Sequence, residues 1–349
     1  MTKPKRPPTQ RALCALLVAC LLSLGCTAGQ TRYTESFLTV FDTATQVTLY
    51  AADQNAAAAR TRAVEEALLF YHRLYDVYHA YEGVNNLYTV NANAGVAPVA
   101  VDAAILDLVA FGKEVYALSG GRVNIAMGSV LALWHDAREA GLADPANAAP
   151  PPMDALREAA RHTSIDDVIV DRAAGTLYLT DPAMRLDVGA LAKGFAGQRV
   201  ADALRAEGTT SMLLNLGGNV CCIGARADGT PWRVGVQDPA SQEVLCTVRM
   251  QDRCLVTSGV YQRYYTVAGQ TYHHIIDPET LLPGAYFAAV SVLCADGGMA
   301  DALSTALFLM PLAEGQALVD SLDGMEALWV FPDGESVYSA GFAACLDGA

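Results

Sequence analysis

Basic side chains are scarce in this sequence. Its 349 residues include 23 Lys and Arg against 37 Asp and Glu, so the formal net charge is −14. An acidic chain has no long-range attraction for nucleic acid or for anionic lipid. Basic residues cluster only within the first eleven positions. The composition therefore predicts no nucleic-acid partner.

Signature motifs of common metal and nucleotide sites are also absent. The nine cysteines form no CxxC and no Cys/His spacing typical of zinc. Neither GxGxxG nor a Walker loop occurs, which excludes the commonest nucleotide motifs. Six cysteines follow Cys26, most of them in apolar, strand-like runs. An even number of cysteines would permit disulfides if the chain is exported. We predict buried free thiols instead, because a buried cysteine behaves as a small hydrophobic residue.

The N-terminus carries a basic head followed by a short apolar run. Four basic side chains within residues 1–11 precede an apolar stretch at 12–24. This order is typical of a secretory signal, and the run is too short for an ordinary membrane span. A cysteine just after such a stretch indicates lipidation. We predict a signal peptide at 1–25, lipidation at Cys26 with Cys20 as the alternative, and an exported protein anchored to the outer face of the cell membrane.

Helical and strand patterns are mixed along the rest of the chain without a βαβα rhythm. With 52% apolar residues, the chain has ample material for a core. The mixture predicts an α+β fold rather than a doubly wound α/β sheet. Strands are predicted at 37–53 and repeatedly between 166 and 296. Helices are predicted at 55–78, 101–121, 153–162, 191–208 and 299–324, the last broken at Pro311, and a hairpin at 325–342.

Three segments follow from these patterns. The signal peptide at 1–25 is followed by a polar tether at 26–36. One domain, with one lobe or two intertwined lobes, is predicted at 37–349. A Pro- and Ala-rich stretch at 141–152 indicates a surface loop or a soft boundary inside it.

The segment "RLDVGALAKGFAGQRVADAL" is a candidate phosphate site. An apolar strand is predicted to end at Asp187, Gly189 allows a tight turn, and a helix begins near Leu191. A helix N-terminus suits a phosphate, which Lys193 could contact, while Asp187 could accept from a base or a ribose. The alternative is an acidic residue that stabilises the helix, with Lys193 in solvent. The local pattern does not decide between them.

Asp301 and Thr305 are a candidate metal pair. They are four residues apart, so on a helix they share one face. A carboxylate and a hydroxyl are hard oxygen donors, as Mg²⁺ prefers, and Mg²⁺ takes few protein ligands besides phosphate. The alternative is an Asp helix cap with Thr305 bonded back to its own helix. Taken alone, the local pattern favours that alternative.

Adjacent histidines and a glycine pair are further candidates. In a strand, His273 and His274 point to opposite faces, so at most one faces a given site. Histidine exchanges protons near neutral pH, but a structural role beside the turn at Asp277 is the alternative. Gly217 and Gly218 allow close approach of the backbone to a ligand, or form an ordinary turn.

Taken in order, these motifs resemble the ApbE family, the FAD:protein FMN transferases. The resemblance covers nearly all of the chain beyond the signal, and a lipoprotein signal also fits the family. The matching strings are "VFDTATQVTLY", "YEGVNNLYTVN", "GGRVNIAMGSVLALWHDAR", "LDVGALAKGFA", "LLNLGGNV", "WRVGVQDP", "TSGVYQRYY", "YHHIIDP" and "ADALSTALF".

The resemblance implies a fold and a reaction. The fold would be ApbE-like and T-fold-related, with mixed antiparallel sheets and packed helices. The reaction would be Mg²⁺-dependent: FAD is split, FMN is attached through a phosphoester bond to Thr or Ser of a target protein, and AMP is released. The implied acceptors are flavin-bearing subunits of membrane redox pumps of the RNF and Nqr type. The alternatives are an Mg²⁺-dependent FAD pyrophosphatase that yields FMN and AMP, and a flavin-binding lipoprotein without turnover.

The resemblance also implies roles for individual residues. Mg²⁺ would be held by Asp301, Thr305 and the backbone carbonyl of Ala190. His274 and Asp301 are the candidates for activating the acceptor hydroxyl. Phe41 stands where the family has a Met. Tyr81 lies near the family's ring-contacting aromatic residue, with Tyr78 as the alternative. Residues 122–124 depart from the family's usual triplet. Contacts to FAD are implied for Phe41, Tyr78, Tyr81, Arg122, Val123, Asn124, Asp187, Lys193, His274 and Ile276.

Overall fold

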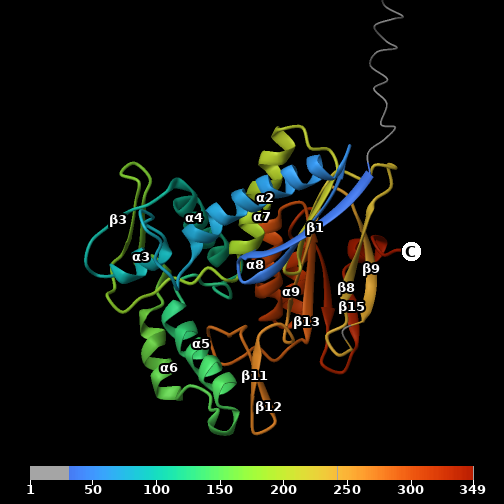
Figure 1. The fold of residues 1–349 in the computed structure, drawn as a ribbon. Helices are drawn as coiled ribbons and strands as arrows, with labels where there is room; N and C mark the ends of the chain where they lie inside the picture. The colour runs from blue at the N-terminus through green and yellow to red at the C-terminus, as the bar shows by residue number, and fades with distance from the viewer. Residues whose placement is uncertain (1–30, 242, 349) are drawn as a thin grey trace, which may run out of the picture.

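An antiparallel sheet forms the centre of the molecule (Figure 1). The computed structural model describes residues 31–241 and 243–348, so the predicted signal peptide and both candidate lipidation sites, Cys26 and Cys20, lie outside the described residues. The sheet has eight strands, and its order is β1-β2-β6-β7-β10-β13-β14-β15. The strands are β1 (Thr31–Val40), β2 (Thr43–Ala51), β6 (Met212–Leu216), β7 (Asn219–Ile223), β10 (Cys254–Gly259), β13 (Ala289–Cys294), β14 (Glu326–Val330) and β15 (Ser336–Tyr338).

The first strand corrects the predicted tether. Residues 31–36 fall within β1, which pairs with β2 from Thr31 opposite Ala51 onward. Tyr33 and Phe37, which lie on the same face of the strand, pack against the core. Thr34 and Ser36, on the opposite face of the strand, are exposed, and their polarity resembles that of a linker.

One face of the sheet is covered by helices. They are α2 (Gln54–Tyr75), α4 (Ala103–Leu118), α7 (Ala192–Ala206), α8 (Gly297–Phe308) and α9 (Leu312–Asp320). Asp53, Asp102 and Asp296 cap α2, α4 and α8 by accepting first-turn N–H groups. Helix α8 packs against α7 and against strands β10 and β13, so nearly all of its residues are buried.

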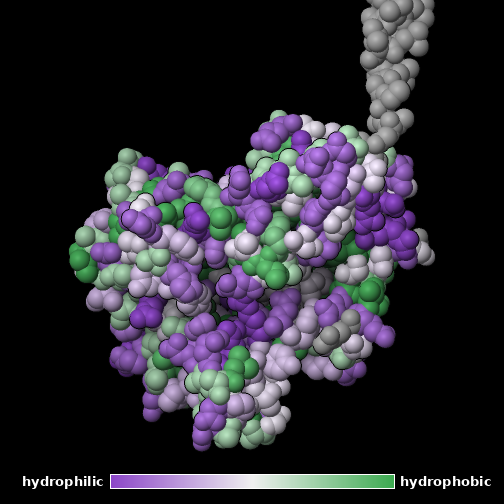
Figure 2. Space-filling view, in the orientation of Figure 1, coloured by the Kyte–Doolittle hydropathy of each residue, from purple (hydrophilic) through white to green (hydrophobic). Residues whose placement is uncertain are grey.

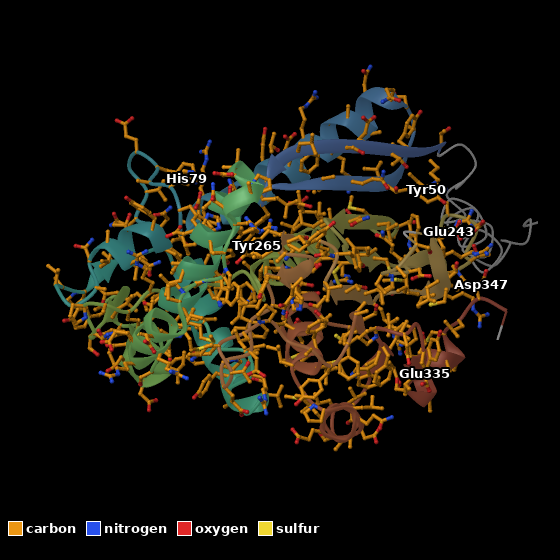
Figure 3. The ribbon with its side chains drawn as sticks, turned by 90° about the horizontal axis from the view of Figure 1, so that it is seen from below. Tyr50, His79, Glu243, Tyr265, Glu335 and Asp347 are labelled. Atoms are coloured by element: carbon orange, nitrogen blue, oxygen red, sulfur yellow. A yellow bond between two sulfur atoms is a disulfide. The ribbon has the colours of Figure 1, made fainter. Side chains whose placement is uncertain are left out.

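The other face is covered by a hairpin and a short helix. Strands β8 (Trp232–Gln237) and β9 (Val244–Met250) pair with each other, and α10 (Ala340–Ala344) lies beside them. Trp232 and Phe342 pack there against Leu255 and Leu293 of the sheet. Figure 3 shows the labelled Glu243 and Asp347 together at this end of the molecule, far from His79.

A smaller lobe closes the other end of the molecule (Figure 1). Part of this lobe has a hydrophobic cluster of its own, which includes Trp134, Leu156, Tyr265 and Ile276. The elements are α3 (Leu87–Ala92), β3 (Val99–Ala100), α5 (Gly128–Ala143), the 3-10 turn η1 (Pro145–Asn147), α6 (Met153–Ala159), the 3-10 turns η2 (Ala160–His162) and η3 (Ile165–Asp167), β4 (Val168–Asp171), β5 (Thr176–Leu179), β11 (Tyr264–Val267) and β12 (Gln270–His273).

The observed fold confirms the predicted α+β class, with corrections in this lobe. Helix α5 is not predicted by the sequence pattern, because its buried positions include two glycines and only two large apolar residues. It also extends to Ala143, into the stretch predicted as a loop. The predicted hairpin at 325–342 forms β14 and β15, but its last three residues belong to α10. Among the described residues, no helix is long and apolar enough to span a membrane.

The cysteines follow the prediction only in part. Cys221 and Cys254 lie opposite each other on β7 and β10 and form a disulfide, so the prediction of free thiols is wrong for this pair. Cys222 and Cys294 are free and buried, as predicted, whereas Cys246 and Cys345 are free but only partly buried. Which two cysteines face each other depends on strand register, which the sequence pattern does not specify.

Candidate active site

All residues predicted for the site line one cleft of about 1640 Å³. Figure 2 shows a hollow with hydrophilic walls at the centre of this face. Sites for single drug-sized ligands typically occupy about 300–1,000 Å³, so the cleft has room for a dinucleotide and part of a second molecule. The common cleft is an observation, whereas the role of each residue remains a prediction.

Residues 187–191 form a loop that leads into α7, whose first turn carries Lys193. Asp187 accepts a hydrogen bond from the N–H of Gly189 (2.8 Å), and its own N–H donates to Ile125 (2.9 Å). The strand predicted to end at Asp187 is absent, since only an isolated bridge joins Arg185 to Met127. Burial raises the pKa of Asp187, and Arg263 partly offsets that rise. The loop therefore places a carboxylate beside the start of a helix.

Asp301 lies deep in the cleft on α8. Its Oδ2 accepts from the N–H of Gly194 (2.8 Å), and its Oδ1 is 3.9 Å from Nζ of Lys193. Burial raises the pKa of Asp301, while Lys193, Gly194 and Asn219 act to lower it. Asn219 lies near enough to Asp301 to lower its pKa. The buried Nδ2 of Asn219 nevertheless has no well-aligned hydrogen-bond acceptor among the described residues. The carboxylate is thus only partly compensated for the loss of water.

The close crossing of α7 and α8 holds these groups together. A Cβ on Gly194 would lie 2.1 Å from the carbonyl oxygen of Gly297 and 2.5 Å from Cβ of Asp301. Only glycine allows the two backbones to approach this closely. The crossing brings Lys193, in the first turn of α7, toward Asp301.

Thr305 lies one turn after Asp301 and also faces the cleft. Its Oγ1 is 3.2 Å from Oγ of Ser258 on β10. The hydroxyl that bonds back to its own helix is that of Ser304, which donates to the carbonyl of Asp301 (2.8 Å). Asp296, rather than Asp301, caps the helix. Neither structural alternative for the Asp301 and Thr305 pair is therefore found.

The two histidines have different surroundings. His273 is buried, and its Nε2 donates to the carbonyl of Gly284 (2.9 Å). His274 opens into the cleft, and its Nδ1 is 3.2 Å from the carbonyl oxygen of Arg263. A carbonyl only accepts, so Nδ1 carries the proton and the lone pair of Nε2 is free.

Burial of the ring and the charges of neighbouring groups lower the pKa of His274 to about 3. The atoms crowded around the ring desolvate it, although the residue is still reached by solvent through the cleft mouth. Arg263 and Lys193 then disfavour a third positive charge nearby. His274 is therefore neutral at physiological pH.

Aromatic side chains form another part of the cleft wall. Phe41 lies in the turn between β1 and β2, and its ring is 5.5 Å from that of His72. Tyr81 donates to Asp76 (2.8 Å), and its hydroxyl is 3.3 Å from Nε2 of His72. Such flat, partly polar surfaces suit a large aromatic ring system.

Tyr78, the rival to Tyr81, lines the same cleft. Its ring stacks on that of His135, with centroids 4.8 Å apart. Burial and the nearby Asp187 raise the pKa of Tyr78 to about 12. Both tyrosines thus line the cavity.

The segment that departs from the family pattern is occupied by internal bonds. Arg122 pairs with Glu279 (3.1 Å) and lies 3.8 Å from Asp277. Asn124 donates to the carbonyl of Thr163 (2.9 Å). Val123 and Ile276, two apolar residues of the predicted site, are largely buried in the protein core. Ala190 is partly exposed at the cleft.

Several site residues escape the sequence-based prediction. Asn219 approaches Asp301 from β7, Ser258 contacts Thr305 from β10, and Arg263 lies beside His274 and Asp187. Arg263 makes no ion pair within the described chain. All three lie inside matching motif strings, but only the fold shows that they meet.

The fold and the cleft are typical of an α+β enzyme. A buried carboxylate, two basic side chains and a neutral histidine line the same cavity. Comparison with known proteins makes the assignment specific. The model of the ApbE family matches residues 41–329, and the chain belongs to this family.

Curated relatives and solved structures agree with this membership. A protein of Treponema pallidum, named FAD:protein FMN transferase, is 33% identical over 345 residues, or 93% of this chain and 92% of its own length. One from Escherichia coli K12 with the same name is 26% identical, over 92% and 93% of the two chains. The ApbE protein of Thermotoga maritima has the same fold, with a TM-score of 0.80 at 24% identity over 91% of this chain and all of its own. The flavin transferase ApbE of Vibrio cholerae gives a TM-score of 0.74 at 23% identity, over 91% and 99%.

Proposed function

We propose that this chain is an Mg²⁺-dependent FAD:protein FMN transferase that attaches FMN through a phosphoester bond to a Thr or Ser hydroxyl and releases AMP. One observation carries the proposal. A buried carboxylate, a helix N-terminus with a lysine, and a neutral histidine with a free Nε2 line the same cleft. These are the groups that phosphoryl transfer from a dinucleotide to a hydroxyl requires.

The donor set around Asp301 fits Mg²⁺. Asp301, Thr305 and the carbonyl of Ala190 supply hard oxygens, and Mg²⁺ commonly combines one or two carboxylates with phosphate and water. Within the described residues, no group of three or more His, Cys, Asp or Glu forms a dedicated metal cage. A bound cation would relieve the partly compensated charge of Asp301 and would neutralise charge on the pyrophosphate as its bond breaks.

The chain's own cations would orient the pyrophosphate. Leu191, the N-cap of α7, provides no side-chain cap, and Ala192 and Lys193 at this positive end of the helix line the cleft. Arg263 adds a second positive charge near His274. These groups favour a polyanion and hold its phosphorus atoms close to Asp301.

His274 is the residue best suited to accept the proton of the acceptor hydroxyl. Its ring is held by the Nδ1 bond to Arg263, which leaves Nε2 unprotonated. Asp301 is the weaker candidate, because its Oδ2 already accepts from Gly194. The acceptor oxygen attacks the phosphorus of the FMN moiety, the bond to AMP breaks, and the hydroxyl proton passes to Nε2. The pyrophosphate's negative charge raises the basicity of the ring while substrate is bound.

The acceptors we propose are flavin-bearing subunits of RNF- or Nqr-type membrane redox pumps. Export and lipidation at Cys26 would place the enzyme at the outer face of the cell membrane, beside such pumps. The support for this location is the basic head, the apolar run and the cysteine of the N-terminal sequence.

One experiment separates the candidate activities. The protein is incubated with FAD, Mg²⁺ and a subunit of an RNF-type pump, and the subunit is then weighed by mass spectrometry. An increase by one FMN supports transfer. AMP and FMN without a mass increase indicate a pyrophosphatase, and intact FAD indicates a binding protein.

A further inference from the structure

The cleft extends beyond the groups that the transfer chemistry needs. One part, the phosphate arm, contains residues 187–193, His274, Asp301 and Thr305. The other part, the hairpin arm, is lined by Gln46, Leu213, Asn215 and residues 233–237 of β8, on the opposite face of the sheet. Gly217 and Gly218, in the turn between β6 and β7, line the same cleft between the two arms.

Strand β8 has one occupied edge and one open edge. Within residues 31–241 and 243–348, it pairs only with β9, in a two-stranded sheet. The outer edge of β9 is taken by the C-terminal segment, because the N–H of Arg249 donates to Cys345 (2.7 Å) and the N–H of Asp347 donates to Thr247 (2.8 Å). No described residue forms backbone hydrogen bonds with the corresponding edge of β8.

The register of the hairpin shows which backbone groups are free. Arg249 and Thr247 direct their backbone groups away from β8, so their partners Arg233 and Gly235 form non-hydrogen-bonded pairs with them. In an antiparallel pair, the groups of such residues point outward. The N–H and C=O of Arg233 and Gly235 therefore point toward the open edge, and no backbone partner for them occurs in the described chain.

The side chains leave this edge accessible. Trp232, Val234 and Val236 are buried in the core beneath the hairpin. Gly235 has no side chain, and the guanidinium of Arg233 is held by Asp347. An open strand edge is a template for a further extended chain, and proteins commonly recognise peptides in this way.

We propose that the open edge of β8 binds an extended segment of the acceptor protein as an added strand, so that its Thr or Ser hydroxyl reaches the phosphate arm. This inference rests on the proposed function, because only a transferase needs a protein acceptor. The acceptor is the partner that fits, since a strand edge recognises a main chain and a flavin has none. Arg32 also lines this arm and has no ion-pair partner in the described chain, which favours an acidic side chain on the bound segment.

Two substitutions at one position test the proposal. Gly235→Pro removes the outward N–H without breaking a bond to β9. Gly235→Ala keeps that N–H and adds the same Cβ, which would lie 3.3 Å from Val244 in both variants. The probe is the flavin-accepting domain of an RNF-type subunit. We expect Gly235→Pro to raise the KM for this acceptor about fivefold or more relative to Gly235→Ala, as loss of one backbone hydrogen bond predicts.

The controls separate this proposal from the proposed function. Both variants are expected to keep the wild-type KM for FAD and the same thermal unfolding midpoint as each other. Equal acceptor KM values for the two variants, or an equal rise in the KM for FAD, would overturn the docking site while leaving transfer intact. Failure of the wild-type protein to label the acceptor would instead refute the proposed function.

Discussion

The phosphate arm and the hairpin arm of the cleft differ in what does the binding. In the phosphate arm, side chains carry the chemistry, and they are held by the close crossing of α7 and α8 at Gly194 and Gly297. In the hairpin arm, the main chain of β8 presents N–H and C=O groups without backbone partners in the described chain, and side chains contribute less. We expect the phosphate arm to bind a charged group and the hairpin arm to bind an extended backbone.

This difference sets the tolerance of each arm to change. A side-chain substitution in the phosphate arm removes a charge or a proton acceptor that has no substitute nearby. A substitution in the hairpin arm matters only if it removes a backbone donor or blocks the edge. The arms are therefore distinguished by whether a variant affects FAD turnover or only acceptor use.

The largest effect is expected at Asp301. Asp301→Asn and Asp301→Ala remove the only acidic donor of the proposed metal set, so FMN transfer and FAD hydrolysis should fall together by about 10³-fold or more. Both rates are measured with saturating FAD and Mg²⁺. Asp296→Ala, which removes the exposed cap of the same helix, should cost about 1 kcal/mol of stability and leave turnover near wild type. Full flavinylation by either Asp301 variant would overturn the metal assignment.

His274 ranks next. His274→Gln removes the free Nε2, and we expect transfer to slow by about 10²-fold or more, with FAD affinity nearly unchanged. Single-turnover transfer and FAD titration by fluorescence measure the two quantities. The contrast is with His273→Gln, which should lower stability through the lost bond to Gly284. A fall in FAD affinity alone would show that His274 binds rather than activates.

Two glycines on α7 test how tightly the phosphate arm is packed. Gly194→Ala places a Cβ against Gly297 and Asp301, so unfolding free energy should fall by about 1–3 kcal/mol. Gly197→Ala is the matched control, because the nearest atom to its Cβ is Leu214 Cδ2 at 3.9 Å. That variant should be neutral or stabilised by up to about 1 kcal/mol. Denaturant unfolding compares them, and equal stabilities would contradict the close crossing.

The smallest expected effect is on the pH dependence of stability. Burial lowers the pKa of His274 from its ordinary value of 6.5 to about 3 in the folded protein. The unfolded chain therefore binds more protons between these values, so His274 contributes a loss of stability as pH falls from 6.5 toward 3 and nothing above 6.5. His274→Gln should show a shallower decline over that window. An unchanged slope would mean that solvent at the cleft mouth keeps the pKa near its ordinary value.

The chemistry of the site was predictable where it depends on local spacing. Asp301 and Thr305 share a helix face because they are four residues apart. His273 and His274 face different surroundings as predicted, although β12 ends at His273 and His274 follows it. The α+β class follows from the mixture of helical and strand patterns. These features need only the period of each element.

What escaped prediction depends on contacts between distant strands and helices. The approach of Asn219 to Asp301 requires β7 to lie beneath α8, and the disulfide requires Cys221 and Cys254 to be in register. Helix α5 is held by Trp134 against Tyr272 rather than by a regular apolar stripe. The open edge of β8 becomes visible only when the partner of every strand is known.

The most direct test of the central claim is the stoichiometry of transfer. Wild-type protein, FAD and an RNF-type acceptor are combined in Mg²⁺ or in EDTA, and the acceptor mass and released AMP are measured together. We expect one AMP for each FMN gained by the acceptor in Mg²⁺, and neither product in EDTA. AMP release without a gain in acceptor mass, or full transfer in EDTA, would contradict the proposed Mg²⁺-dependent transfer.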